Sequence, residues 1–118
     1  MRDVKIRTQK FAIDCWKLCA DIPKSREFNA YVNQLIRSSS SVGANFRASQ
    51  RAKSDKDFIN KLKIVEEECD ESIYWLEIFI EITDTNQNEF RRLHKEGNEL
   101  LAITVASINT AKKRMAKN

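Results

Sequence analysis

The chain has 118 residues, of which only two are Gly and one is Pro, and it carries a formal net charge of +4. Gly and Pro average about 12% of residues in proteins and supply most tight turns, so this composition favours a few long helices over a strand-rich fold. The length suits one compact domain spanning residues 1–118. No apolar run approaches the roughly 18 residues of a membrane span, and no signal-peptide pattern follows the charged N-terminus, so we expect a cytoplasmic protein.

Helical periodicity predicts a first helix over residues 4–20, which ends before Pro23 because the residue preceding a proline disfavours helix. A second helix is predicted over residues 27–51. Its apolar positions recur at intervals of three and four residues, which places them on one face of a helix. These positions are Phe28, Tyr31, Val32, Leu35, Val42 and Phe46.

A third helix is predicted from Ser54 to about residue 83, where Ser54 and Asp57 resemble a capping box. A polar loop follows, and a fourth helix is predicted over residues 88–115. Gly97 lies inside this helix at a cost of about 1 kcal/mol relative to Ala, which indicates the close approach of a neighbouring helix. Four helices joined by short loops predict an all-α, antiparallel up-down-up-down four-helix bundle.

The second helix contains four consecutive serines, residues 38–41, followed by Gly43. Asn45 falls near the apolar stripe, and a buried Asn needs hydrogen-bond partners, for which Ser41 or carboxylates of the third helix are candidates. Two interpretations stay open at this point. The stretch is either a tight helix–helix seam with a satisfied polar network or a ligand site.

The third helix carries two acidic residues, Glu68 and Glu71, that are expected to face Arg37 and Gln34 of the second helix in a polar seam within or between subunits. Beside them is an aromatic pair, and a further tryptophan lies in the first helix. For each of these aromatic residues we consider a core position or a subunit interface, where Trp and Tyr are enriched. The three residues are Trp16, Tyr74 and Trp75.

The same residues resemble the signature of a bacterial four-helix-bundle family, the 23S rRNA intervening-sequence proteins, some of which are encoded within intervening sequences of rRNA genes. The resemblance covers about residues 8–112. Ala48 stands where the family usually has Glu, and Glu67 stands where it usually has Lys. The segments that carry the resemblance are Gln34-x-x-Arg37-Ser38-x-x-Ser41-Val42-Gly43-Ala44-Asn45, Ser54-x-x-Asp57-Phe58-Ile59-x-Lys61 and Glu68-x-x-Glu71-Ser72-x-Tyr74-Trp75-Leu76-Glu77.

The resemblance implies an antiparallel four-helix bundle that forms homo-oligomers, typically a ring-like pentamer. The family is similar to the accessory proteins of diversity-generating retroelements, which bind nucleic acid and a reverse transcriptase. For this chain the resemblance therefore implies oligomerisation and a possible contact with nucleic acid or a protein partner.

Charge is distributed unevenly along the chain. Residues 1–10, 47–57 and 112–118 carry a net charge of +9, and the other 90 residues carry −5. An up-down bundle is expected to bring these three windows to one end, and a concentrated positive field favours polyanions in a salt-dependent manner. The basic residues of this predicted nucleic-acid interface are Arg2, Lys5, Arg7, Lys10, Arg47, Arg51, Lys53, Lys56, Lys112, Lys113, Arg114 and Lys117.

Phosphate contact is the expected mode of binding, because the aromatic residues near these windows fall on apolar stripes and are not available for stacking. The alternative is a solvated basic face that favours helix macrodipoles and solubility.

We expect no enzymatic activity, metal or cofactor. A di-iron bundle site requires Glu-x-x-His motifs, whereas the chain has one histidine, His94, and no such motif. Phosphate-binding and nucleophile motifs are also missing from the sequence. Cys15, Cys19 and Cys69 are interpreted as small buried thiols. The sequence thus predicts a non-enzymatic homo-oligomer that binds nucleic acid, with a protein-interaction scaffold as the alternative.

Overall fold

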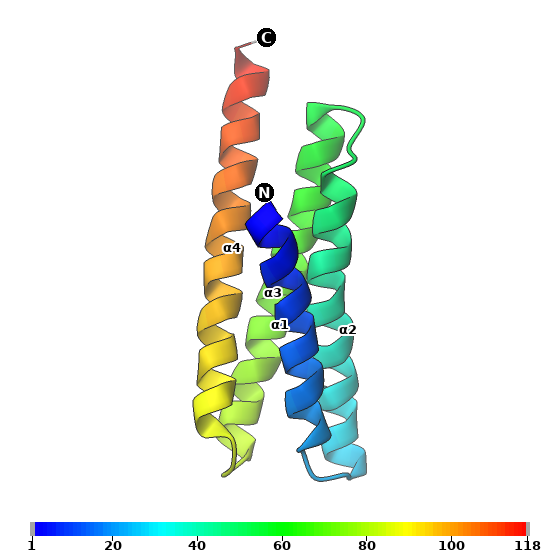
Figure 1. Cartoon of the computed structure of the whole chain (residues 1–118), viewed down its shortest axis with the longest axis vertical. Helices are drawn as coiled ribbons and strands as arrows, with labels where there is room; N and C mark the ends of the chain where they lie inside the picture. The colour runs from blue at the N-terminus through cyan, green and yellow to red at the C-terminus, as the bar shows by residue number, and fades with distance from the viewer. Residues whose placement is uncertain (1, 118) are drawn as a thin grey trace.

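The computed structural model describes residues 2–117, and across them the chain forms four helices (Figure 1). Each helix contacts the next one along the chain, and α4 also contacts α1, so the helices form a closed ring of neighbours. This is the predicted antiparallel up-down-up-down bundle, and the predicted helix boundaries lie within two residues of the observed ones. The helices are α1 (Arg2–Ala20), α2 (Arg26–Ser49), α3 (Asp55–Ile82) and α4 (Gln87–Ala116).

Side-chain caps define where two of the helices begin. The Ser25 hydroxyl accepts a hydrogen bond from the Phe28 N–H at 3.0 Å, and the Ser54 hydroxyl accepts one from the Asp57 N–H at 3.1 Å. The Asp57 carboxylate in turn accepts a hydrogen bond from the Lys53 N–H at 3.1 Å. These bonds satisfy N–H groups that have no partner within the helix, and they confirm the N-terminus predicted at Ser54.

The core is a continuous apolar column in which every predicted stripe contributes buried side chains. Phe79 of α3 and Phe90 of α4 stack with their ring centroids 5.6 Å apart beside the α3–α4 loop. The largest buried apolar side chains are Phe11, Leu35, Phe46, Leu62, Leu76, Phe79, Phe90, Leu93 and Leu100.

The serine-rich stretch of α2 is continuous helix and forms a helix–helix seam. The Ser38 hydroxyl lies 2.8 Å from the Ser72 hydroxyl of α3, and both residues are buried. On the α1 side, a Cβ added to Gly43 would lie 3.2 Å from Oγ1 of the buried Thr8. Within the described part of the chain, every buried side-chain nitrogen or oxygen has a hydrogen-bond partner. The interpretation as a satisfied structural seam is therefore the one that the geometry supports.

Gly97 of α4 lies where three helices meet. A Cβ at this position would be 3.1 Å from Cγ1 of Ile73 in α3 and 3.5 Å from the Phe11 ring of α1. The first of these distances is tighter than ordinary van der Waals contact, so the glycine permits the close helix approach that its mid-helix position predicts.

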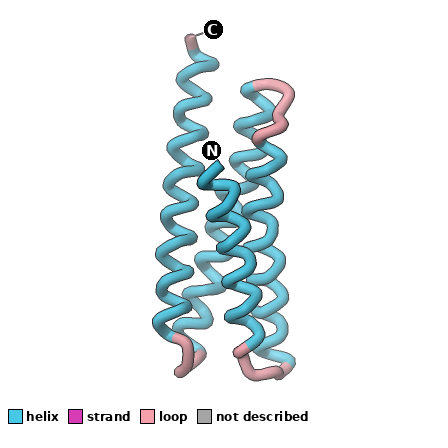
Figure 2. The backbone as a smooth tube through the Cα atoms, in the orientation of Figure 1, coloured by secondary structure: helices cyan, strands magenta, loops and turns pink. Residues whose placement is uncertain are grey.

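The four helices differ in length, and this difference shapes one end of the bundle. α1 has 19 residues and α4 has 30. Figures 1 and 2 show that α1 begins well below the α2–α3 loop and that the last turns of α4 extend beyond it. No helix formed by residues 2–117 is long and apolar enough to cross a membrane.

Replacing Gly97 with Leu is expected to destabilise the protein, because the new side chain would overlap Ile73 and Phe11. The free energy of unfolding should fall by about 1–3 kcal/mol, although leucine is the better helix former. Urea denaturation followed by circular dichroism measures the change. Ala102→Leu is the matched control, since Ala102 is exposed on the same helix. Equal stability of the two variants would contradict the role assigned to Gly97.

Candidate nucleic-acid interface

Basic side chains gather where α2 ends and α3 begins. Arg47 and Arg51 follow each other by one turn at the end of α2, and Lys53 and Lys56 flank the N-cap of α3. All four are exposed, and the only recorded side-chain contact among them is a 3.4 Å hydrogen bond from Arg47 to Gln9. None of the four makes an ion pair with a described residue.

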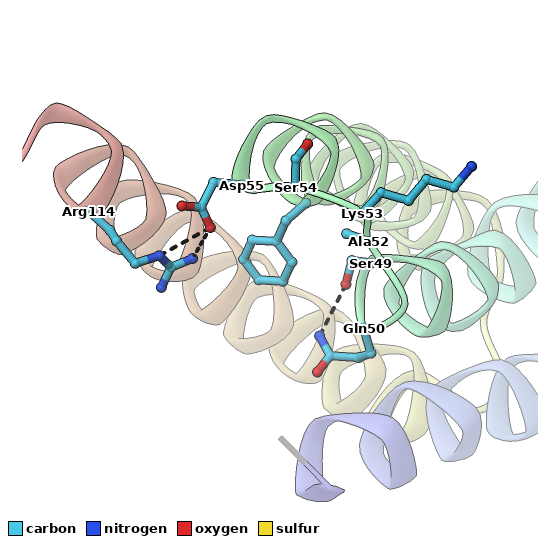
Figure 3. A pocket seen from close by; sticks show the side chains of 8 residues that line it. Ser49, Gln50, Ala52, Lys53, Ser54, Asp55 and Arg114 are labelled. Atoms are coloured by element: carbon cyan, nitrogen blue, oxygen red, sulfur yellow. Dashed lines mark hydrogen bonds and ion pairs between the residues drawn. The ribbon is translucent and has the colours of Figure 1, made fainter. Parts of the chain in front are cut away.

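The last turns of α4 lie at the same end of the bundle. Lys112, Lys113 and Lys117 are exposed, and no ion pair joins them to the described residues. Arg114 is different, because its guanidinium reaches across to Asp55 at the start of α3 at 2.7 Å (Figure 3). The hydrogen bond from Arg114 holds the pKa of Asp55 below its usual value. This ion pair ties the end of α4 to α3.

The start of α1 lies beside this end of α2, because Arg47 donates a hydrogen bond to Gln9 of α1 at 3.4 Å. α1 begins below the α2–α3 loop, as Figure 1 shows, and two of its basic side chains are engaged in ion pairs. Arg7 contacts Glu96 of α4 at 2.6 Å, and Lys10 contacts Asp14 at 3.1 Å. Lys5 is exposed on α1.

Arg2 also falls in this window, but its side chain lies outside the described residues. The observed basic tip therefore consists of residues 47–57 and 112–117, which carry eight basic and two acidic side chains, or +6.

Asp14 is the ion-pair partner that holds Lys10 against α1. Its side chain is only 10% exposed, and its carboxylate accepts a 2.9 Å hydrogen bond from Arg92 of α4 in addition to the contact with Lys10. Burial raises the pKa of Asp14, but the hydrogen bonds from Arg92 and Lys10 outweigh it, so the pKa lies below its usual value. A buried carboxylate on α1 with two basic partners is thus part of the attachment of α1 to the bundle.

A shallow polar hollow of about 410 Å³ lies at this end of the bundle, and its basic lining residues are Lys53 and Arg114 (Figure 3). Gln50 donates a hydrogen bond to the Ser49 hydroxyl at 3.2 Å within it. Its one aromatic side chain, Phe58, is half-buried. The other lining residues are Ala52, Ser54 and Asp55. Exposed cations around a polar surface suit contact with phosphate oxygens rather than stacking with bases.

The polar seam predicted between the second and third helices forms within one subunit. Arg37 of α2 contacts Glu68 at 3.2 Å and Glu71 at 2.5 Å on α3. The hydrogen bond from Arg37 lowers the pKa of Glu71, which also accepts a bond from the Trp75 indole N–H at 3.2 Å. Gln34 is exposed and makes no hydrogen bond with a described side chain, so the structure does not bring it into this network.

Asn45 and Ser41 make local contacts along α2. The Asn45 amide donates to the Ser41 backbone carbonyl at 2.8 Å, and the Ser41 hydroxyl donates to the Arg37 carbonyl at 2.9 Å. Of the two candidate partners for Asn45, the structure selects Ser41, through its backbone, and not the carboxylates of α3. These bonds satisfy the polar groups inside the helix.

The three aromatic residues have different environments. Trp75 packs against the core, with its ring 5.5 Å from that of Tyr31. Tyr74 is 55% exposed and Trp16 is 60% exposed, so the interface interpretation stays open for these two. Sequence reasoning missed four further exposed apolar residues, Ile64 and Ile82 of α3 and Ile6 and Ile13 of α1. For Ile6 and Ile13, the seven-residue spacing off the buried stripe of α1 is the signal that could have identified them.

All three cysteines are buried and free. Burial raises the pKa of Cys19 to about 11 and that of Cys69 to about 12, so both thiols are protonated at neutral pH. Within the described residues, no three His, Cys, Asp or Glu side chains are grouped to hold a metal ion.

The fold and its charges define a four-helix bundle with one basic, open end. A family model described as 23S rRNA-intervening sequence protein matches residues 2–106, and the chain belongs to this family. It is similar to the crystal structure of a protein of unknown function from the S23 ribosomal protein family of Bacteroides thetaiotaomicron, with 30% identity and a TM-score of 0.81. That match covers 89% of this chain and 97% of the other. No curated protein matches the chain.

Replacing Arg92 with Met removes one partner of the buried Asp14 carboxylate. The folded-state pKa of Asp14 lies below its unfolded value, so the stabilisation is present at neutral pH and is lost as the pH falls through the folded pKa. We expect the free energy of unfolding to fall by about 1–3 kcal/mol at pH 7 and the deficit to shrink below about pH 4.

Urea denaturation at pH 7 and pH 3 measures this difference. Glu89→Gln is the control, because it removes only the more exposed partner of Arg92, whose contribution is about 0–1 kcal/mol. A deficit of equal size at both pH values would contradict the role assigned to Asp14.

Proposed function

We propose that this protein is a non-enzymatic homo-oligomer that binds nucleic acid through phosphate contacts at its basic tip. The observation that carries the proposal is the set of seven exposed basic side chains at the tip that make no ion pair with any described residue. They are Arg47, Arg51, Lys53, Lys56, Lys112, Lys113 and Lys117. Such a cluster releases counterions on binding a polyanion, so its affinity depends steeply on salt and little on sequence.

The distribution of ion pairs supports this role. Three arginines along the body of the bundle, Arg7, Arg37 and Arg92, each pair with an acidic residue on a neighbouring helix. Arg47 and Arg51 at the tip make no ion pair with a described residue. At the tip, Arg114 with Asp55 is the one basic side chain in an ion pair between described residues. A solvated basic face remains the competing explanation, and binding measurements separate the two.

Two exposed strips on opposite sides of the bundle support the homo-oligomer. The α1 strip consists of Ile6, Ile13 and Trp16, which are 52%, 44% and 60% exposed. The α3 strip consists of Ile64 and Tyr74, which are 42% and 55% exposed. In the ring of helices α1 and α3 are diagonal, so the two strips face away from each other.

The two strips match in charge and in spacing. Lys10 and Lys17 are exposed beside the α1 strip, and Lys10 also contacts Asp14. Around the α3 strip the exposed acidic residues Glu67, Asp70 and Glu77 outnumber the exposed Lys63. Ile6 and Trp16 are ten residues apart, as are Ile64 and Tyr74, and both separations correspond to about 15 Å along a helix. α1 and α3 also run in the same direction in an up-down bundle.

A contact between the α1 strip of one subunit and the α3 strip of the next is heterologous. Such a contact repeats from subunit to subunit and closes into a ring when the rotation permits. We infer that the oligomer is a ring of this kind, for which the family resemblance implies a pentamer. A ring with its axis along the bundle would place all the basic tips on one rim and strengthen the positive field.

The nucleic-acid proposal predicts that the protein binds RNA or DNA with strong salt dependence. The triple variant Arg47→Glu, Arg51→Glu, Lys53→Glu should lose at least about tenfold in affinity, because like charges then face the phosphates. Fluorescence anisotropy with labelled RNA and DNA at low and physiological salt measures the affinity.

The matched control reverses three exposed charges at the opposite end, Lys24, Arg26 and Arg91. It has the same net charge as the triple variant and should keep the affinity. No binding at low salt, or an equal loss in both variants, would reject the basic tip as the interface and leave the scaffold alternative.

The ring proposal predicts an oligomer larger than a dimer in solution. Trp16→Asp and Tyr74→Asp should each yield a folded monomer, because both side chains are exposed in the isolated subunit and lie in the proposed contact. Light scattering after size-exclusion chromatography measures the mass. Met115→Asp is the control, since Met115 is also exposed but lies near the end of α4. A monomeric wild-type protein at micromolar concentration would refute the ring.

A further inference from the structure

An apolar groove of about 390 Å³ runs along the upper part of α4, beside α3. Phe58 and Ile103 are half-buried within it, and their apolar surface has no covering element among the described residues. The groove is lined by Phe58 of α3 and by Ile103, Ala106, Ser107, Thr110 and Arg114 of α4.

This groove lies on the face of α4 that α1 covers lower in the bundle. Along the lower part of α4, Glu96 and Glu99 face α1 through their contacts with Arg7. Ile103 follows Glu96 by seven residues and Thr110 follows Glu99 by eleven, so all four lie on one face of α4. Figures 1 and 2 show that, among the described residues, no helix takes the place of α1 along this face above the first turn of α1.

Small side chains line the groove on the α4 side. Ala106, Ser107 and Thr110 leave room for another backbone to come close, and Phe58 supplies apolar surface opposite them. The occupied part of the bundle uses the same arrangement, since Gly97 of α4 lies against the Phe11 ring of α1. The groove thus has the shape of an unfilled helix position, with a length of about 16 Å from residue 103 to residue 114, or roughly three helical turns.

The surroundings of the groove are basic. Phe58 and Arg114 also line the adjoining polar hollow, which contains Lys53, and Lys113 is exposed next to Arg114. The basic tip of a second copy would bring like charges together here, so charge repulsion opposes a contact between two tips. The positive charge favours an occupant whose polar face is acidic.

We propose that the groove binds an amphipathic helix of a partner protein, about three turns long, with large apolar side chains on one face and Glu or Asp on the other. The partner helix occupies the fourth position of the bundle above α1, as amphipathic helices do in apolar grooves. This inference goes beyond the proposed function, because it concerns an apolar surface and a protein partner, whereas the proposed function rests on exposed basic side chains.

A synthetic probe tests the groove on the intact protein. The probe is a fluorescein-labelled 16-residue peptide with Leu at positions 1, 4, 8, 11 and 15 and Glu or Ala elsewhere, compared with a scrambled peptide of the same composition. Fluorescence anisotropy at physiological salt should show at least about tenfold tighter binding of the patterned peptide. Equal binding of the two peptides would overturn the proposal, because charge attraction alone would then explain it.

Substitutions locate the site. Ala106→Phe should weaken binding of the patterned peptide by about tenfold or more, because Ala106 is exposed in the groove and a ring there fills it. Ala102→Phe is the matched control on the same helix, outside the groove lining, and should leave binding unchanged. Thr110→Phe provides a second blocking variant if Ala106→Phe alters the fold. Unchanged binding in a folded blocking variant would reject the groove as the site.

The same variants separate this proposal from nucleic-acid binding. Ala106→Phe leaves every charge in place, so RNA affinity should be retained while peptide affinity is lost. Failure of RNA binding with retained peptide binding rejects only the proposed function. Loss of both RNA and peptide binding in Ala106→Phe, with the fold intact, would overturn the assignment of a separate apolar groove.

Discussion

The close packing of α1 against the other helices is the constraint that determines which surfaces of this molecule are exposed. It is made possible by two glycines, since a side chain at Gly43 would press on Thr8 and one at Gly97 would press on Ile73 and Phe11. In this position α1 forms two ion pairs with α4, one between Asp14 and Arg92 and one between Arg7 and Glu96. The outer face of α1 carries the exposed α1 strip, and the groove lies above the first described residues of α1.

Electrostatics follows from this packing. A basic residue close to an acidic residue of a neighbouring helix gains a partner that is partly shielded from water, and the pKa of Asp14 below its usual value reports that stabilisation. The tip has few acidic residues to serve as partners, and Asp55 is already held by Arg114. The positive charge at the tip therefore follows from the residues at the helix ends. The packing of the helix bodies does not supply acidic partners for these residues.

Most of the fold could be predicted from the sequence, because the relevant signals are local. Pro23 and Ser54 mark helix boundaries, apolar spacing identifies the buried face, and Gly97 stands out as a costly residue inside a helix. The basic tip was predicted only in part. The count of charges by window ignores contacts between side chains, so it includes Arg7 and Lys10, which Glu96 and Asp14 engage in the structure.

Other features depend on how each helix is rotated about its axis. Tyr74 and Trp75 are adjacent in the sequence, yet a rotation of about 100° per residue puts one ring in solvent and the other against Tyr31. The partners of Asn45 and Arg37 follow from the same rotations. The groove depends on the rotation of α4 about its axis and on the positions of α1 and α4 along the bundle. Neither of these can be predicted from one segment of the sequence.

The ring contact is separate from the other two proposed surfaces, because the α1 and α3 strips share no residue with the tip or with the groove lining. The groove shares Arg114 and Phe58 with the hollow at the tip, so a helix bound in it would lie beside a nucleic acid held there. An acidic helix in the groove would also weaken the field at the tip. Occupation of the groove by such a partner would therefore lower the affinity for nucleic acid, and by thermodynamic linkage bound nucleic acid would lower the affinity for the partner by the same factor.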